Sequence, residues 1–199
     1  MKFVTKDVYI YPISLKITKI MVYMLKDIDT FENLNKIELM QILKKEASKI
    51  SIMDIMKACS FLSEDAKYVQ GSYREEYLKS YNEAFITRLK ALKDDKKNYT
   101  DQVDCKKVQE AVNLLKDQEI QVNAGKGFDP HFFKIYKIMS IYTTFILEES
   151  VHPPGTPFPG GFKVKYENGT YLCPVKENQK DNPGAVCGFC IAEHDESFL

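Results

Sequence analysis

The sequence predicts a mainly α protein, in which a bundle of five or six helices precedes a small C-terminal β-hairpin and irregular loops. Apolar residues recur at helical spacing through most of the first 150 residues, where glycine and proline are scarce. Glycine and proline are instead concentrated after residue 150, which favours turns over long helices. We therefore expect a helical bundle at residues 1–150 and a Pro/Gly-rich module at residues 151–199, packed on the bundle.

Several stretches of the first part have an apolar face at helical spacing, as amphipathic helices require. They cover residues 14–27, 36–50, 72–93 and 104–117, the last with Asp104 as its N-cap. A further helix begins at Ser51, and Asp54 three positions later resembles the partner in a capping box, although Glu or Gln is more usual there. The apolar face of this helix is expected to contain Ile52, Ile55, Met56, Cys59 and Leu62.

The strongest helix start is Asp129-Pro130, an N-cap followed by proline at the first helical position. From there to about Glu149 the segment is apolar on nearly every side, and only Lys134 and Lys137 indicate a solvated edge. A helix that is apolar all round is normally buried. We expect this helix to be the axis of the bundle.

One hairpin is indicated in the C-terminal part. Residues 162–166 alternate apolar and charged side chains, and residues 170–175 provide a second short strand. Between them, Asn168-Gly169 is typical of a type I′ turn, whose two central residues need positive φ.

Composition excludes several functional classes. The apolar fraction of 44% and the charged fraction of 28% are those of a folded globular protein. The formal net charge is zero and arginine occurs only at Arg74 and Arg88, so there is no strong signal for nucleic acid. Residues 8–25 are interrupted by charges and residues 138–147 are too short to span a bilayer. We expect a soluble, cytoplasmic protein without a targeting segment or membrane association. Its partner is left open, and a protein partner is compatible with this composition.

The five cysteines fall into two groups. Cys59 and Cys105 lie on the apolar faces of predicted helices, where free cysteine packs as a small hydrophobe. Cys173 ends the second hairpin strand, and Cys187 and Cys190 form a C-x-x-C in a Pro/Gly-rich loop. A C-x-x-C can present two thiolates to one metal ion, and a third thiolate from an adjacent hairpin extends the set. The sequence thus predicts a metal site containing these last three cysteines.

The fourth ligand has two candidates, His152 at the end of the long helix and His194 four positions after Cys190. Either histidine gives a Cys3His set, which is common in structural zinc sites. Zinc is therefore the expected cofactor. If His152 were displaced, the open position would allow Lewis-acid chemistry, with Glu148 or Glu149 as a general base.

Other interpretations of the three cysteines remain open. An iron–sulfur cluster would leave one iron to a histidine or to solvent. A redox-active C-x-x-C of the thioredoxin type needs a strand before it and a helix after it, which the sequence does not indicate. A Cys173–Cys187 disulfide is disfavoured by the expected reducing compartment. Unmetallated surface thiols are the remaining alternative.

The segments His152–Val164, Tyr171–Val175 and Asn182–Cys190 resemble a family of uncharacterised proteins from methanogenic archaea, a domain of unknown function. The resemblance is specific over about the last fifty residues and looser from about residue 36 onward. The family pattern begins at the position of His152 and has no fixed histidine at His194, which implies His152 as the fourth ligand. The resemblance also implies an archaeal, cytoplasmic and anaerobic setting, and it implies no activity.

The function itself is left as two classes. The first is a zinc-stabilised helical protein that interacts with another protein, or with RNA. The second is a metal-dependent, iron–sulfur or redox enzyme of archaeal metabolism, for which no catalytic residue can be named.

Overall fold

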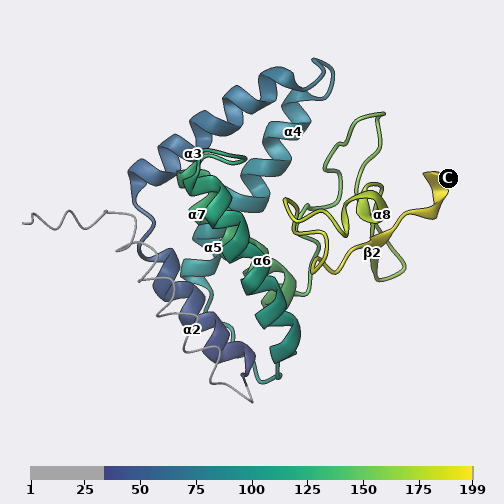
Figure 1. The fold of residues 1–199 in the computed structure, drawn as a ribbon. Helices are drawn as coiled ribbons and strands as arrows, with labels where there is room; N and C mark the ends of the chain where they lie inside the picture. The colour runs from purple at the N-terminus through teal and green to yellow at the C-terminus, as the bar shows by residue number, and fades with distance from the viewer. Residues whose placement is uncertain (1–33, 199) are drawn as a thin grey trace, which may run out of the picture. The chain divides into compact units, whose positions relative to one another are not determined.

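The computed structural model describes residues 34–198 (Figure 1). The mainly α fold is confirmed, with a small sheet near the C-terminus. The helix expected at residues 14–27 lies outside the described residues. Within residues 34–198, no helix is both long and apolar enough to cross a membrane.

Five helical rods make up the first part of the described chain. Two of them change from α to π geometry along their length. Such π segments are rare in proteins, and those that occur are often near functional sites. The rods are α2 (Lys36–Ala47), α3 (Ile52–Asp65) with the 3₁₀ turn η1 (Ala66–Tyr68), α4 (Arg74–Tyr81) continued by the π segment η2 (Asn82–Thr87) and α5 (Arg88–Asp94), α6 (Cys105–Asn123), and α7 (Pro130–Ile141) continued by the π segment η3 (Tyr142–Leu147).

The helix starts follow the predicted capping residues. Ser51 and Asp54 form the reciprocal capping box of α3, because the Asp54 N–H donates to Ser51 Oγ at 3.1 Å and the Ser51 N–H donates to Asp54 Oδ2 at 2.9 Å. Asp104 caps α6 through the N–H of Lys107. Asp129 caps α7, with Pro130 at the first helical position.

The predicted apolar face of α3 is wrong at its first turn, although Leu62 is buried as expected. Ile52 is 77% exposed and Met56 is 59% exposed, whereas the buried residues are Asp54, Ala58 and Leu62. The helix is turned this way because Asp54 reaches groups on α7. Its carboxylate Oδ1 accepts from Lys134 Nζ at 2.8 Å and lies 2.7 Å from His131 Nδ1.

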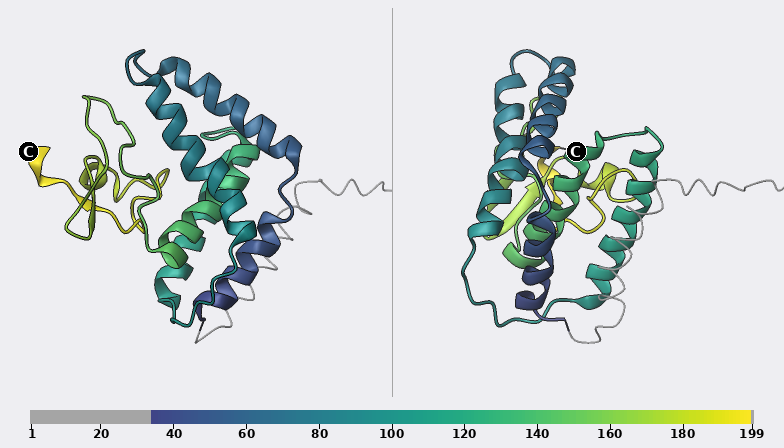
Figure 2. Two further views of the ribbon diagram at one scale, coloured as in Figure 1. Left: turned by 180° about the vertical axis from the view of Figure 1, so that it is seen from behind. Right: turned by 90° about the vertical axis from the view of Figure 1, so that its left-hand side faces the viewer.

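The central position of α7 is confirmed. It contacts α2, α3, α5, α6 and η2, and its residues Phe132, Ile135 and Met139 are completely buried. Figure 1 shows α7 among the other helices, with α6 beside it, and Figure 2 shows the same grouping from two further sides. Lys137, expected at a solvated edge, is instead largely buried and paired with Glu119 at 2.6 Å.

The residues after η3 form a loop-rich segment with little regular structure. The predicted hairpin is confirmed as β1 (Lys165–Glu167) paired antiparallel with β2 (Thr170–Cys173), and the turn residues Asn168 and Gly169 both have positive φ. A strand that the sequence does not predict, β3 (Glu193–His194), pairs with β2 in parallel. Two short helices complete the segment, α8 (Lys176–Gln179) and the 3₁₀ turn η4 (Glu196–Phe198).

Asp54 should make the stability of the bundle depend on acid pH. Burial opposes its ionisation, but hydrogen bonds from Lys134, Ser51 and His131 outweigh this cost and hold the pKa of Asp54 well below its usual range. A carboxyl with a depressed folded pKa contributes its full stability above the unfolded pKa of about 3.9 and loses it as the pH falls through the folded pKa.

We therefore expect Asp54→Asn to lower the free energy of unfolding by about 2 kcal/mol at pH 7. The deficit should shrink as the pH falls below about 4, because the unfolded chain then takes up a proton at Asp54 that the folded chain does not bind. The difference in the free energy of unfolding between the two proteins is measured by urea unfolding, followed by circular dichroism, at pH 7 and at about pH 2. The matched control is Glu64→Gln on the same helix, whose ion pair with Lys67 is exposed. An equal deficit at both pH values would contradict the expectation.

Candidate metal centre

His152 is positioned by the end of the central helix. The rod ends at Glu148, which has the left-handed φ of 54° that turns the chain away from the helix axis. The Glu148 carboxylate accepts from the buried ammonium of Lys36 at 2.7 Å, which ties this turn to α2. Two residues before His152, the Ser150 hydroxyl donates to the His152 carbonyl at 2.6 Å. Both contacts hold the short segment that leads from the end of the helix to His152.

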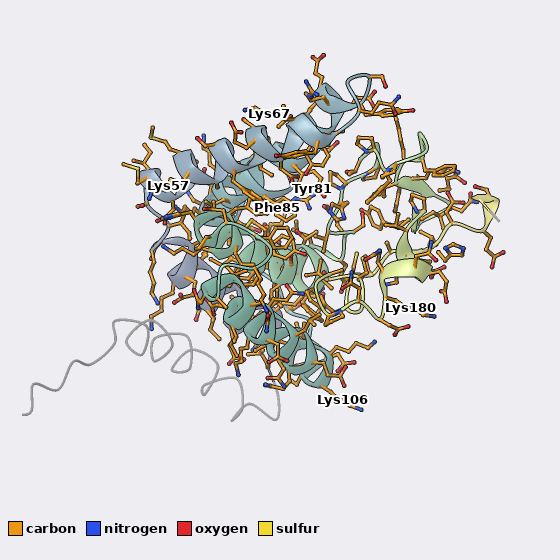
Figure 3. The ribbon with its side chains drawn as sticks, turned by 45° about the horizontal axis from the view of Figure 1, so that its top comes forward. Lys57, Lys67, Tyr81, Phe85, Lys106 and Lys180 are labelled. Atoms are coloured by element: carbon orange, nitrogen blue, oxygen red, sulfur yellow. The ribbon has the colours of Figure 1, made fainter. Side chains whose placement is uncertain are left out.

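The His152 ring lies among aromatic side chains. Its centroid is 5.4 Å from that of Tyr81, 5.6 Å from Phe158 and 6.4 Å from Phe85. Tyr81 and Phe85 come from α4 and η2, and Figure 3 shows both inside the molecule. Burial in these surroundings lowers the pKa of His152 to about 4. The imidazole is therefore neutral at pH 7 and keeps a nitrogen lone pair for a ligand.

Cys173 is positioned by the small sheet. It ends β2, where it pairs with His194 of β3, and its carbonyl accepts from the Asp195 N–H at 3.2 Å. The side chain is buried against Val164 and Ala192. The pairing of β2 with β3 therefore fixes the backbone at Cys173.

The C-x-x-C is held as a tight turn. The N–H of Cys190 donates to the Val186 carbonyl at 3.0 Å. Phe189 stacks on Phe145 of η3, with centroids 6.1 Å apart. At Gly188, a Cβ atom would lie 3.0 Å from the Lys180 carbonyl oxygen, so a larger residue would require the backbone to shift. Contacts to both η3 and the residues after α8 thus fix this turn.

Lys176 is a residue of the site that the sequence analysis missed. Its ammonium donates to the carbonyl of Cys187 at 2.5 Å and to that of Cys190 at 2.8 Å. It is the first residue of α8, three positions after Cys173. No spacing rule for metal ligands marks such a residue, because it acts through the backbone of the C-x-x-C.

Four predicted ligands, His152, Cys173, Cys187 and Cys190, line one small cavity of about 10 Å³. Its remaining wall is formed by Lys176 and mainly apolar side chains. His194 does not line this cavity, although it is paired with Cys173 in the sheet. A cavity of this volume has room for one water-sized guest. The structure thus brings residues from three separate segments around a single small space.

The thiols in this cavity are disfavoured as free anions. Burial, with additions from Cys173 and Cys190, raises the pKa of Cys187 to about 11, and burial also raises the pKa of Cys173. One group is already placed to support a sulfur with negative charge, since the Val151 N–H donates to Cys190 Sγ at 3.4 Å. A metal cation beside Cys173 and Cys187 would offset the cost of ionisation and favour their thiolate forms.

Within the described part of the chain, the structure contains neither the disulfide nor the general base that the sequence left open for this site. All five cysteines are free, so no disulfide joins Cys173 to Cys187. Glu148 and Glu149 are paired with Lys36 and Arg88, and neither lines the cavity. In the positions described for residues 34–198, no three His, Cys, Asp or Glu side chains are arranged so that they could hold a metal ion.

Cys59 and Cys105 do not line this cavity either. Both are half-buried rather than in the core. Cys105, at the start of α6, accepts from the Leu34 N–H at 3.2 Å.

The fold and this cavity define a helical protein with a cysteine- and histidine-lined C-terminal segment. The chain belongs to a family described as uncharacterised proteins conserved in archaea (DUF2115), whose model matches residues 35–195. The match covers the helices α2 to α8 and all four residues around the cavity.

Relatives of similar length occur in methanogens. A UPF0305 protein of Methanothermobacter thermautotrophicus is 40% identical over 165 residues, which are 83% of this chain and 99% of the relative. A UPF0305 protein of Methanocaldococcus jannaschii is 30% identical over 161 residues, 78% of this chain and 94% of the relative. In Methanopyrus kandleri, a third is 33% identical over 131 residues, 64% of this chain and 88% of the relative. No solved structure is significantly similar to the chain.

Proposed function

We propose that His152, Cys173, Cys187 and Cys190 bind one zinc ion, which clasps the loop-rich C-terminal segment onto the helical bundle. The observation that carries the proposal is the convergence of these four side chains on one small cavity. Cys3His is a common donor set of structural zinc sites. To coordinate an ion, the side chains must turn toward the cavity from their described positions.

The chemistry of the donors supports this assignment. The neutral imidazole of His152 needs no deprotonation before it binds a metal. Cys173 is buried and Cys187 and Cys190 are half-buried around the same cavity, where a divalent cation would offset the repulsion among their thiolates. The Lys176 ammonium and the Val151 N–H supply further positive potential around the sulfurs.

The size of the cavity favours one ion over a cluster. A volume of about 10 Å³ accommodates a single ion, whereas an iron–sulfur cluster contains several iron and sulfide atoms. A second consideration is the number of donors, since four protein ligands complete a tetrahedral zinc shell. A complete shell leaves no open position for a substrate, so the role we propose for zinc is structural.

The function that follows is that of an interaction protein. Zinc would stabilise a loop-rich segment that has a small apolar core of its own, around Val164, Cys173 and Ala192. The rigid surface would then bind a protein partner, for which the near absence of arginine makes RNA the weaker alternative. We place the protein in the cytoplasm, where thiolates stay reduced.

Metal analysis of the full chain, purified without oxygen and without an affinity tag that binds metal, tests the proposal. We expect about one zinc per chain and a protein without visible absorption. Replacement of zinc by cobalt(II) should give the visible bands of a tetrahedral thiolate site. A brown protein that contains iron and sulfide would show that the site holds an iron–sulfur cluster and not zinc. A protein that binds neither zinc nor cobalt would overturn the proposed metal site.

A further inference from the structure

A second and much larger cavity lies outside the candidate metal centre. It has a volume of about 690 Å³ and lies between α3, α4, α6, the start of α7 and the loop at Pro183 and Gly184. Cavities of 300–1,000 Å³ are typical of small-molecule sites in proteins. None of the four candidate zinc ligands lines it.

Much of its wall is aromatic. Phe61 and Phe132 are tilted against each other at 5.3 Å, and Phe128 closes on Phe61 edge to face at 6.4 Å. Tyr77 and Tyr81 lie together on the α4 side at 4.3 Å. All five rings line the cavity. Aromatic faces carry negative potential and attract cations.

The charged groups of the cavity are mainly acidic. Asp65 and Asp117 line it, from α3 and α6, and among residues 34–198 Lys126 is the one cationic side chain in its wall. Asp65 accepts a hydrogen bond from the Tyr77 hydroxyl, which leaves its other lone pairs for a ligand. Asp117 and Lys126 are both exposed, at the solvent side of the wall.

Gln118 provides an independent indication of a ligand. This residue lines the cavity and is only 6% exposed. Its amide Nε2 donates to the carbonyls of Pro183 at 2.9 Å and Ala185 at 3.2 Å. Because both neighbours are acceptors, the orientation of the amide is fixed. Its Oε1 is buried with no hydrogen-bond partner among the described residues. A buried acceptor without a donor is costly and calls for an explanation.

We propose that this cavity binds a small organic cation that carries N–H donors, such as a protonated amine on an aromatic or aliphatic body. The body packs on the aromatic wall, the charge is met by Asp65 and Asp117, and an N–H reaches Gln118 Oε1 when the wall around this buried oxygen shifts to admit it. The proposal does not depend on zinc, because none of the four candidate ligands lines this cavity, although Tyr81 lines it and also contacts His152.

Three probes of similar size separate these contributions by isothermal titration calorimetry on the full chain as purified. The first is 2-phenylethylamine, which is protonated at pH 7, and the second is neutral 2-phenylethanol. The third is trimethyl-(2-phenylethyl)ammonium, which keeps the charge and lacks N–H donors. We expect the amine to bind about tenfold more tightly than the alcohol, and more tightly than the trimethyl compound.

Substitutions locate the site. Asp117→Asn, on an exposed residue, and Asp65→Asn should each weaken the amine about fivefold or more and leave the alcohol unchanged. Glu110→Gln, an exposed carboxylate on α6 outside this cavity, is the matched control and should have no effect. Equal binding of all three probes, no binding of the amine, or equal loss in Glu110→Gln would each overturn the proposal.

Discussion

Cys187→Ser is expected to abolish stoichiometric zinc binding and to lower the melting temperature of the chain by about 10 °C. The reason is linkage, because zinc that binds only the folded chain stabilises it by about 4 kcal/mol when its free concentration is a thousand times the dissociation constant. For a chain of this length, each kcal/mol corresponds to about 2–4 °C. Elemental analysis gives the metal content, and circular dichroism gives the melting temperature with and without added zinc.

Cys59→Ser is the matched control, since this half-buried cysteine of α3 does not line the cavity. It should keep its zinc and lose little stability. His152→Ala and His194→Ala separate the two histidines, and we expect only His152→Ala to lower zinc affinity. A zinc content that survives Cys187→Ser and falls in His194→Ala would show that the ligand set has been assigned incorrectly.

Phe85→Ala is expected to lower the free energy of unfolding by about 3–5 kcal/mol, the range found when large buried side chains are truncated. Phe85 is completely buried in η2 and contacts Phe132 at 5.4 Å and Tyr136 at 5.3 Å. It also lies 5.7 Å from Tyr81 and 6.4 Å from His152, measured between ring centroids. Loss of this ring should therefore also free the histidine, and lower zinc affinity in addition to stability.

Phe132→Ala is the control for this second effect. Phe132 is equally buried and packs in the same aromatic cluster, but none of its ring contacts reaches His152. Both variants should unfold at similarly reduced urea concentrations, and only Phe85→Ala should release zinc more readily to a chelator. Equal zinc affinities in the two folded variants would mean that Phe85 supports the core alone.

The helices could be predicted from sequence wherever local chemistry decides them. Ser51, Asp104 and Asp129 cap helices as expected, because a cap depends on residues within one turn. The face of α3 could not be predicted, because Asp54 is drawn inward by Lys134 of a distant helix. The π geometry of η2 and η3 was also missed, since the apolar spacing of these segments resembles that of an ordinary helix.

In the candidate site too, some residues could be predicted from the sequence and others could not. The three cysteines stood out because no helical or strand period explains them, and the structure places them with His152 around one cavity. Lys176 and the strand β3 were missed, because each acts through backbone atoms. A two-residue parallel strand has no sequence signature. The zinc itself and the division of the chain at residue 150 remain predictions.

The spacer of the C-x-x-C has a consequence for how such loops vary among related chains. In thiol–disulfide enzymes, the two intervening residues adjust the reactivity of the cysteines. Here Gly188 lies against a backbone carbonyl and Phe189 stacks on η3, so packing accounts for both positions. We expect related chains to accept other large apolar residues in place of Phe189 but few in place of Gly188. The two spacer residues would then be determined by how the loop packs on the rest of the protein and not by a redox potential.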